Sequence, residues 1–399
     1  MKKNRSYVKY GIFLFFIIFC LSILFVLYTS MQTGFVKKFP YYTNQWVFVQ
    51  KDRNLLKGFN EIDGNYYVFD QETGIMEYGF KDINNQTYYF GEDGKAVKGL
   101  QTIDNDTYYF KDDATLQKNA WYHQNQQISY SGKDGKFVTG YQTLNEKTYL
   151  FDEKGNLSVD TQALQKGYEE ILSYYSGNVG IYFEDLRTHQ SVSINDVAMY
   201  PCCMIKVPGL AAVYQEAEKG NVSIQENAYH IDKMISISDN SSFNIMMNKI
   251  GGMKSIEIVN TLCKDLGMDR TEFHHALRPG SHVFSDGGEN VSCPSDIGKI
   301  LRALYEGKLV SEQSSQEMIG VLKGCRDTLK LRTGIPYTVD FAHKTGDTIT
   351  NHHDGGIVYL PGNEYILVVF SEHVPNFENL MYEISNYTYQ FQNESRVEF

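Results

Sequence analysis

The stretch Met199-Tyr200-Pro201-Cys202-Cys203-Met204-Ile205-Lys206 decides how the distal part of the chain is interpreted. Cys203 and Lys206 are three positions apart, and residues at that spacing share one face of a helix. The apolar residues that follow recur at helical spacing and predict a helix that continues to about Gly220. We therefore expect Cys203 in the first turn of a helix, where the helix dipole and the Lys206 ammonium would both favour a thiolate.

Two further triplets follow in the chain, Ser238-Asp239-Asn240 and Lys344-Thr345-Gly346. Alone, the first suits a helix N-cap and the second an ordinary strand end. In this order, and preceded by Cys-Met-Ile-Lys, they resemble the S-x-x-K, S-D-N and K-T-G motifs of class A β-lactamases and penicillin-binding proteins. The resemblance covers residues 160–399. It implies an α+β β-lactamase/transpeptidase-like domain with an antiparallel sheet and a helical block.

The hydrophobic pattern of the distal region also indicates an α+β fold. Residues 161–175 and 377–392 have the pattern of helices. Four short stretches have the pattern of strands, at residues 179–183, 191–194, 356–360 and 365–370. A sheet built from both ends of a domain, with helices between them, is an α+β arrangement.

The resemblance implies a covalent acyl-enzyme at Cys203. Lys206 would be the general base or the charged partner of a thiolate, and the sequence leaves both open. Ser238 would pass a proton to the leaving group, while the backbone N–H groups of Cys203 and Asp347 would bind the oxyanion. The residues expected to hold the substrate, a β-lactam or a D-Ala-D-Ala-type peptidoglycan peptide, are Asn240, Lys344, Thr345, Gly346 and Asp347. We expect no metal and no cofactor, since no histidine pair has zinc spacing with a matching third ligand.

Three features depart from the family pattern. A cysteine replaces the nucleophilic serine, and Ser238 follows Cys203 by only 35 positions, fewer than the family keeps. Residues 270–290 contain Glu272 and Glu289 but no E-x-x-L-N phrase, where class A enzymes place the glutamate for deacylation. Efficient β-lactam hydrolysis is therefore not expected. The alternative to an acyl-transferase or hydrolase is a catalytically degenerate wall-binding protein that acts as a sensor or scaffold.

Residues 39–158 repeat a short aromatic unit. Phrases that begin at Gly58, Gly79 and Gly99 recur every 20 or 21 residues. The Asp-Gly pairs at 63–64, 93–94 and 134–135 predict hairpin turns. Because one hairpin cannot bury its aromatic face, we expect the units to stack into a β-hairpin solenoid.

These repeats resemble the glucan- and choline-binding repeats of Gram-positive surface proteins, in which aromatic side chains enclose a ligand. The implied partner is peptidoglycan, a wall polysaccharide or a teichoic acid. Trp121 keeps the tryptophan that usually follows the glycine, whereas Phe59, Phe80, Leu100 and Tyr141 replace it. The aromatic residues expected to contact a wall ligand are Tyr67, Tyr88, Tyr89, Tyr108, Tyr109 and Trp121. The alternative is a spacer in which these rings form only a core.

The N-terminal part of the chain predicts export. Residues 11–29 are predominantly apolar and predict a transmembrane anchor. The basic residues within 1–10 favour a cytoplasmic tail, and residues 30–38 would be a linker. A cleaved signal peptide is the alternative, and either way the distal regions would be extracellular and associated with the cell wall. The net charge of −11 gives no electrostatic reason to expect a nucleic-acid partner.

Overall fold

The computed structural model describes Ile17 and residues 32–38, 44–124 and 127–394. The chain forms two compact units, one of residues 1–122 with 129–138 and one of residues 123–128 with 139–399. Except for Ile17, the predicted anchor at residues 11–29 lies outside the described residues. Among the helices that the structure describes, none is long and apolar enough to cross a membrane.

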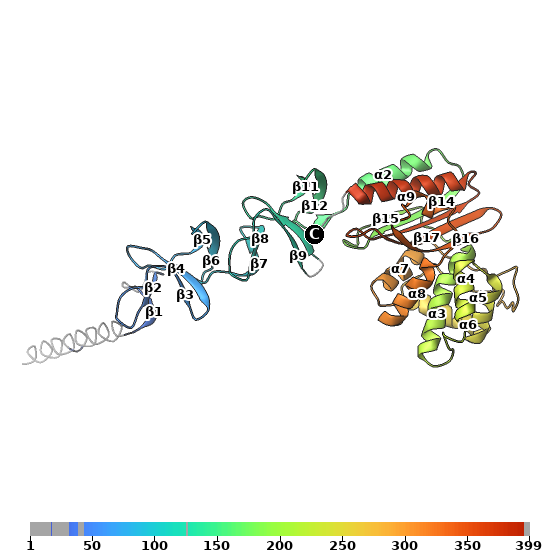
Figure 1. The fold of residues 1–399 in the computed structure, drawn as a ribbon, viewed down its shortest axis with the longest axis horizontal. Helices are drawn as coiled ribbons and strands as arrows, with labels where there is room; N and C mark the ends of the chain where they lie inside the picture. Colours follow the sequence, from blue (N-terminus) through green and yellow to red (C-terminus); the bar gives the residue numbers. More distant parts are fainter. Residues whose placement is uncertain (1–16, 18–31, 39–43, 125–126, 395–399) are drawn as a thin grey trace, which may run out of the picture. The chain divides into compact units, whose positions relative to one another are not determined.

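The first unit consists of β-hairpins, each a two-stranded sheet (Figure 1). Consecutive hairpins are joined by backbone hydrogen bonds, such as that from Ala96 N–H to the Tyr66 carbonyl at 2.9 Å. This confirms the prediction of β-hairpin repeats. The strands are β1 (Gly34–Lys37), β2 (Trp46–Val49), β3 (Gly58–Ile62), β4 (Asn65–Phe69), β5 (Gly79–Ile83), β6 (Gln86–Phe90), β7 (Gly99–Ile103), β8 (Asp106–Phe110), β9 (Ala120–Gln124) and β10 (Gln127–Ser131).

Two-residue turns with positive φ join β3 to β4, β5 to β6 and β7 to β8. Asp63-Gly64 joins β3 to β4 as predicted. Asp93-Gly94 and Asp134-Gly135 also lie in tight turns, where Phe90 pairs antiparallel with Ala96 and Ser131 with Phe137, but these turns follow β6 and β10. The turns within the β5–β6 and β7–β8 hairpins, Asn84-Asn85 and Asp104-Asn105, were not predicted. Asn and Asp also tolerate the left-handed backbone, so each repeat contained more than one candidate turn.

The second unit is built on a five-stranded antiparallel sheet, in the order β15-β14-β18-β17-β16. The edge strand β16 contains Lys344-Thr345-Gly346. Because several of its buried residues are polar, the hydrophobic pattern did not predict this strand. The strands are β14 (Asn178–Asp185), β15 (Ser191–Ile194), β16 (Asp340–Asp347), β17 (Asn351–Tyr359) and β18 (Tyr365–Glu372). A small sheet of β11 (Gly140–Leu144), β12 (Lys147–Phe151) and β13 (Leu157–Ser158) precedes them.

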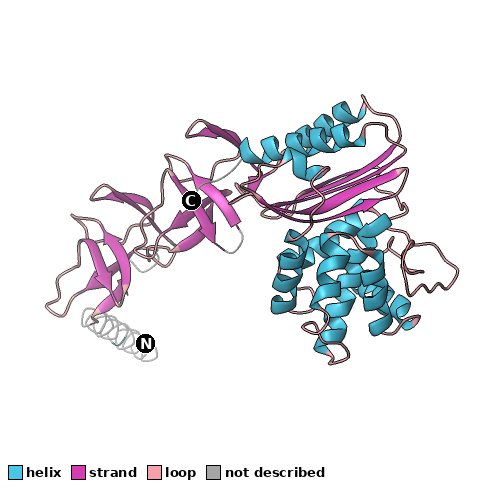
Figure 2. Ribbon diagram, turned by 45° about the vertical axis from the view of Figure 1, so that its right-hand side comes forward, coloured by secondary structure: helices cyan, strands magenta, loops and turns pink. Residues whose placement is uncertain are grey.

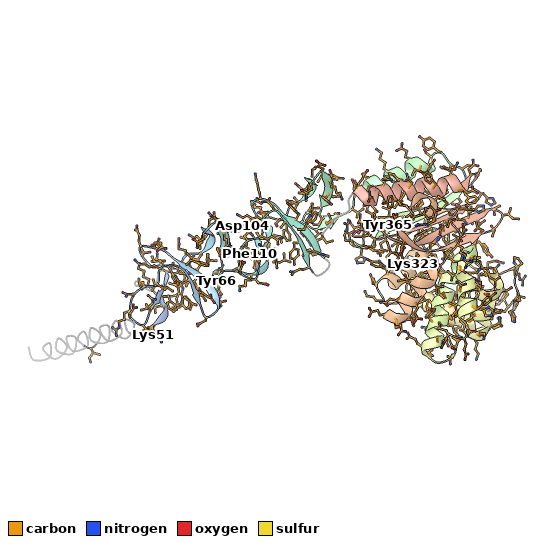
Figure 3. The ribbon with its side chains drawn as sticks, viewed as in Figure 1. Lys51, Tyr66, Asp104, Phe110, Lys323 and Tyr365 are labelled. Atoms are coloured by element: carbon orange, nitrogen blue, oxygen red, sulfur yellow. The ribbon has the colours of Figure 1, made fainter. Side chains whose placement is uncertain are left out.

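Helices cover both faces of the five-stranded sheet, as Figure 2 shows. In β18, Leu367 and Val369 pack with residues of α2 and α9, while Val368 and Phe370 pack with the helical block on the other face. A strand buried on both faces needs a continuous apolar run. Tyr365, labelled in Figure 3, belongs to this run, and it is fully buried. The predicted α+β fold is confirmed. The helices are α2 (Thr161–Leu172), α3 (Lys206–Glu218), α4 (Ala228–Ser236), α5 (Asn240–Lys249), α6 (Lys254–Asp265), α7 (Pro294–Tyr305), α8 (Glu312–Lys323) and α9 (Phe377–Glu394).

Candidate active site

Cys203 lies in a 3₁₀ turn, Cys202–Ile205, that leads directly into α3. The predicted α-helical turn at Cys203 is therefore wrong, because α3 begins only at Lys206. Cys202 has a φ of 50°, a left-handed conformation that an α-helix does not contain. A 3₁₀ turn still places residues three apart on one side, so the half-buried Cys203 remains next to Lys206.

Lys206 is completely buried, and its ammonium is surrounded by hydrogen-bond acceptors. Nζ donates to the Ser238 carbonyl at 2.5 Å and to Asn240 Oδ1 at 2.8 Å, and lies 3.3 Å from Ser238 Oγ. Burial lowers the pKa of Lys206 to about 8, although the Cys203 sulfur opposes that shift. Acceptors on several sides match the three N–H groups of a charged ammonium.

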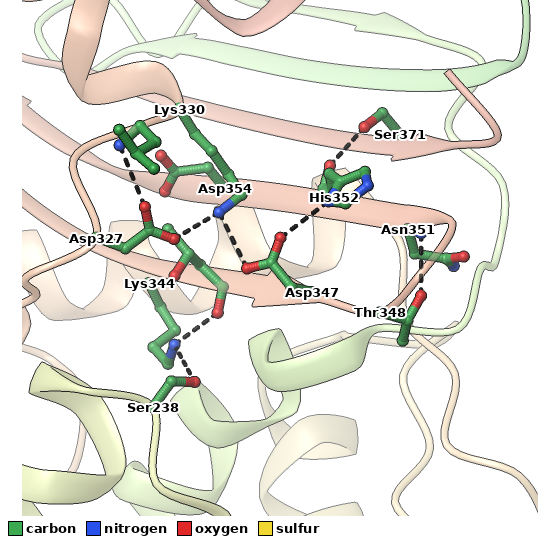
Figure 4. Close-up of polar contacts among 12 residues, drawn as sticks. Ser238, Asp327, Lys330, Lys344, Asp347, Thr348, Asn351, His352, Asp354 and Ser371 are labelled. Atoms are coloured by element: carbon green, nitrogen blue, oxygen red, sulfur yellow. Dashed lines mark hydrogen bonds and ion pairs between the residues drawn. The ribbon is translucent and has the colours of Figure 1, made fainter. Parts of the chain in front are cut away.

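Ser238 connects the two lysines. Lys344 Nζ donates to Ser238 Oγ at 2.8 Å and to the Thr345 carbonyl at 2.5 Å (Figure 4). Since Ser238 Oγ accepts from Lys344, its own hydrogen can be directed at the Cys203 sulfur. Burial alone raises the pKa of Cys203. The Lys206 and Lys344 ammonium groups and the Ser238 hydrogen bond outweigh burial, so the pKa lies below that of an ordinary thiol.

The Ser238-Asp239-Asn240 triplet caps helix α5 and also contributes side chains to the candidate site. Asp239 is the N-cap of α5 and accepts a hydrogen bond from Ser242 N–H at 2.6 Å. The cap fixes the first residue of α5, Asn240, whose Oδ1 lies 3.6 Å from Cys203 Sγ. The helix-cap interpretation and the site interpretation of this triplet are therefore compatible.

Gly346 brings the end of β16 against the Cys202–Ile205 turn. A Cβ added to Gly346 would lie 3.0 Å from the Cys203 backbone nitrogen and 2.9 Å from Cys202 Cβ. The backbone that follows Gly346, which leads to Asp347, therefore runs close to the Cys203 N–H. An oxyanion site made by the N–H groups of Cys203 and Asp347 requires this proximity.

Lys330 lies beside the same end of β16, and no sequence motif marks it. Its Nζ lies 3.0 Å from Asp347 Oδ2 and 2.5 Å from Asp327 Oδ2, and His352 Nδ1 lies 3.0 Å from Asp347 Oδ1 (Figure 4). The Asp347 side chain is thus fixed from two sides. Because Asp347 lies 17 positions from Lys330, only the fold reveals the contact.

His353 fixes the segment that leads to Cys203. His353 Nε2 lies 2.9 Å from the Tyr200 carbonyl, and Ser371 N–H donates to His353 Nδ1 at 3.1 Å. These partners require a neutral ring with its hydrogen on Nε2. Burial lowers the pKa of His353 to about 4, which is consistent with that neutral form. No sequence motif indicates this role.

The two glutamates of the 270–290 segment are paired with histidines. Glu272 Oε2 lies 2.8 Å from His274 Nε2, and Glu289 Oε2 lies 3.4 Å from His275 Nε2. The Glu289 side chain is 81% exposed, so this carboxylate is well solvated. Within the part of the chain that the structure describes, no group of three His, Cys, Asp or Glu side chains could hold a metal ion.

The predicted wall-ligand aromatics fall into two groups. Tyr67, Tyr88 and Tyr108 are buried, whereas Tyr89, Tyr109 and Trp121 are half-buried. Rings of neighbouring hairpins pack on the buried group, with Phe59 at 4.9 Å from Tyr88 and Phe80 at 5.2 Å from Tyr108 between centroids. A cavity of about 370 Å³ is lined by Phe35, Trp46, Tyr67, Met76, Tyr78, Glu92, Asp93 and Lys95.

Comparisons with known proteins agree with this division of the chain. The model of the beta-lactamase enzyme family matches residues 163–230 and 228–392, and that of the cell wall binding repeat matches residues 79–96 and 98–113. No curated protein matches the chain in sequence.

Solved structures resemble the second unit. The β-lactamase from Sphaerobacter thermophilus DSM 20745 is 19% identical, with a TM-score of 0.52 over 59% of this chain and 98% of that chain. A PBP-A mutant, solved as its acyl-enzyme complex with penicillin G, is 22% identical, with a TM-score of 0.51 over 57% of this chain and 96% of its own. An ancestral class A β-lactamase is 18% identical, with a TM-score of 0.50 over 57% and 99%. At these identities the similarity shows the fold alone.

Proposed function

This chain belongs to the beta-lactamase enzyme family through residues 163–392, and we propose that it is an acyl-transferase or hydrolase that forms a covalent acyl-enzyme at Cys203. The observation that carries the proposal is the placement of one thiol between two buried ammonium groups and the Ser238 hydroxyl. The proposed substrates are β-lactams or D-Ala-D-Ala-type peptides. Penicillin G, which forms an acyl-enzyme with the PBP-A mutant, is a β-lactam.

In the proposed first step, the Cys203 thiolate attacks the carbonyl carbon of the substrate. A C–S bond forms, and the carbonyl oxygen becomes an oxyanion that the backbone N–H groups of Cys203 and Asp347 stabilise. The C–N bond then breaks, and the leaving nitrogen takes the proton of the Ser238 hydroxyl, which in turn takes a proton from the Lys206 ammonium. Ser238 Oγ also receives a hydrogen bond from Lys344. Lys206 is thus charged before attack, when it holds the thiolate, and neutral once the acyl-enzyme has formed.

The proposed role for the substrate-binding residues follows from charge and position. Lys344 and Thr345 lie on the edge strand β16, next to Ser238. An ammonium and a hydroxyl there would bind the carboxylate that β-lactams and D-Ala-D-Ala peptides carry near the reacting carbonyl. Asn240, fixed at the start of α5, would orient the substrate amide.

Intact-protein mass spectrometry with benzylpenicillin, and separately with a D-Ala-D-Ala peptide, tests the proposal. We expect a covalent adduct that peptide mapping assigns to Cys203. Cys203→Ala should abolish it, while Cys325→Ser, which removes another thiol, should retain it. Absence of any adduct, or an adduct on another residue, contradicts the acyl-enzyme and supports a non-catalytic role.

Slow release of the acyl group is a second part of the proposal. Glu272 and Glu289 are each paired with a histidine, and neither occurs in an E-x-x-L-N phrase. Without a positioned base for the attacking water, the penicillin adduct should persist. Turnover of a chromogenic cephalosporin, measured together with the amount of adduct, separates a β-lactamase from an acyl-transferase.

For the repeats we propose binding to the cell wall. The supporting observation is the cavity of the first unit, where aromatic rings occur together with Glu92 and Asp93. Rings and carboxylates together suit a cationic group of a wall polymer. Residues 11–29 would tether the protein to the membrane, with the repeats (39–158) and the 160–399 domain outside the cell.

A further inference from the structure

A cavity of about 380 Å³ lies in the second unit, and none of its lining residues belongs to the candidate active site. One side is the turn between β14 and β15, which contributes Arg187, His189 and Gln190. Another side is the turn between β12 and β13, which contributes Asp152 and Asn156. Asp152 and His189 are exposed, so a ligand can enter from solvent. The volume lies within the usual range of ligand pockets, roughly 300–1,000 Å³.

Arg187 is a buried cation with donors that no described residue accepts. Its side chain is only 9% exposed. Nη2 donates to Asp185 Oδ2 at 3.2 Å, whereas Nε and Nη1 are buried and have no hydrogen-bond partner among the described residues. The Asp185 carboxylate already accepts from the backbone and hydroxyl of Thr188 and from Gln392. Because buried donors in folded proteins are almost always paired, we expect a ligand to supply the acceptors for Arg187.

Gln190 supplies a second donor to the same cavity. Its Oε1 accepts from Val159 N–H at 2.6 Å and from Ser158 Oγ at 3.1 Å. A backbone N–H can only donate, which fixes the orientation of the Gln190 amide. Among the described residues, the amide nitrogen has no partner. The two bonds also join the β14–β15 turn to the end of β13, so this donor is held in place.

The charges around the cavity favour a neutral ligand over an anion. Asp185 already neutralises Arg187, so the guanidinium lacks acceptor atoms rather than a counter-charge. Asp152, a second carboxylate, lines the cavity and would repel an anion. It accepts hydrogen bonds from the backbone of Lys154 and from the backbone and side chain of Asn156. A carboxylate has about four acceptor positions, so Asp152 can still accept from a ligand hydroxyl.

We propose that this cavity binds a neutral sugar unit of a glycan. Sugar hydroxyls both accept and donate, so they match the Arg187 and Gln190 donors and the Asp152 acceptor. Leu157 and Ile128, buried residues that also line the cavity, suit the apolar C–H face of a pyranose ring. A small rotation of the guanidinium turns its unpaired N–H groups toward the sugar. One sugar unit binds weakly, so the site would orient a glycan strand and leave anchoring to the repeats.

Saturation-transfer NMR on the unaltered full chain, in a detergent that contains no sugar, tests the proposal. The probes are N,N′-diacetylchitobiose and cellobiose, two neutral disaccharides that differ in their acetamido groups. We expect saturation of at least one of them, and a preference between the two identifies the kind of glycan. No saturation of either disaccharide overturns the proposal. Displacement of the sugar by an equal concentration of sodium acetate would identify an anion site and also overturns it.

Two variants assign the bound sugar to this cavity. Arg187→Met should weaken binding by about tenfold or more, because hydrogen bonds from a charged donor are strong. Arg326→Met, at an exposed arginine of the same unit, is the matched control and should leave binding unchanged. Gln190→Glu keeps the acceptor for Val159 but replaces the free donor by an acceptor, so it should also weaken binding. Gln225→Glu, at an exposed glutamine, is its control.

Unchanged sugar binding in folded Arg187→Met and Gln190→Glu proteins contradicts the proposal. If Arg187→Met does not fold, Gln190→Glu decides. Tyr78→Ala, which alters the cavity of the first unit, and Cys203→Ala should both retain the sugar signal, because neither residue lines this cavity. A signal that is lost in either of these two and kept in Gln190→Glu would assign the sugar to another site and overturn the proposal.

Discussion

The charge on Lys206 distinguishes two ways to activate Cys203. Its Nζ is surrounded by acceptors from Ser238 and Asn240, which favours an ammonium beside a thiolate. We therefore expect the rate of acylation by benzylpenicillin to rise as Cys203 ionises, at a pH below that needed for a free thiol. The rate should fall above about pH 8, where Lys206 loses its proton.

If instead a neutral Lys206 acts as general base, the basic limb of the pH–rate profile, the part above about pH 8, should slope the other way. The acylation rate would then increase through about pH 8, as Lys206 loses its proton. Rates of adduct formation, measured by mass spectrometry across this range, decide between the two. Lys206→Met should remove the basic limb, and Lys249→Met, which changes an exposed lysine at the end of α5, should keep it.

At the scale of elements, the site depends on how closely β16 approaches the Cys202–Ile205 turn. In Gly346→Ala, the new methyl group would lie 3.0 Å from the Cys203 nitrogen and would displace one backbone against the other. A shift on the order of 1 Å at a reacting centre costs about 100-fold in rate. We expect an acylation rate reduced by that order, with the fold retained.

Gly320→Ala is the matched control for Gly346→Ala. Gly320 lies within α8, and nothing lies within 4 Å of its added Cβ. Alanine should leave acylation unchanged and stabilise the helix by about 0.5–1 kcal/mol. Acylation of Gly346→Ala at the rate of the unaltered protein would show that the close approach does not control the site.

The sequence predicted those elements that are determined by residues close together in the chain, and it missed features that depend on contacts between distant residues. The apolar run of β18 and the pattern of α9 depend on neighbouring residues, and both elements form where they were expected. The 3₁₀ turn at Cys202–Ile205 depends on packing against β16, which no local pattern reveals. The contacts of His353 with Tyr200, and of Lys330 with Asp347, join residues far apart in the chain. Three short motifs predicted the grouping of the lysines and Ser238 because that order is characteristic of a known family.

For the whole molecule, two buried histidines make stability depend on pH in opposite directions. The pKa of His353 is lowered by burial from 6.5 to about 4, so the unfolded chain alone takes up this proton as the pH falls below 6.5. The unfolding free energy should decrease by about 3 kcal/mol by about pH 4. For His343 burial lowers the pKa, but Asp354 raises it to about 10, so its stabilisation is complete below pH 6.5 and is lost as the pH rises.

Urea unfolding at a series of pH values measures both effects. His353→Asn should lower stability near neutral pH, because the stacking on Phe370 is lost, but it should also remove most of the decline between about pH 6.5 and pH 4.5. His373→Asn, at an exposed histidine with a φ of 54° that Asn tolerates, is the matched control and should retain that decline. A decline that persists unchanged in His353→Asn would assign the acid sensitivity to other groups.

The two compact units also predict that wall binding and acylation can be separated. A chain that begins at Thr139 keeps the β11–β12 hairpin, whose Tyr141 hydroxyl donates to the Asp160 carboxylate at the start of α2. It removes the cavity of the first unit. Benzylpenicillin should acylate this shorter chain at a rate within about twofold of the full chain, because the residues of the proposed acyl-transfer site all belong to the second unit. Its sedimentation with purified cell walls should be lost.

A point substitution tests the same separation within the full chain. Tyr78 lines the cavity and is 37% exposed, so Tyr78→Ala should weaken co-sedimentation without unfolding the hairpins. Tyr174, 79% exposed in the second unit, provides the matched Tyr174→Ala control and should leave co-sedimentation intact. Wall binding that survives both removal of the first unit and Tyr78→Ala would place the wall contact in the second unit. Binding that disappears in those two proteins, with acylation unchanged, would establish the repeats as an anchor that acts independently of Cys203.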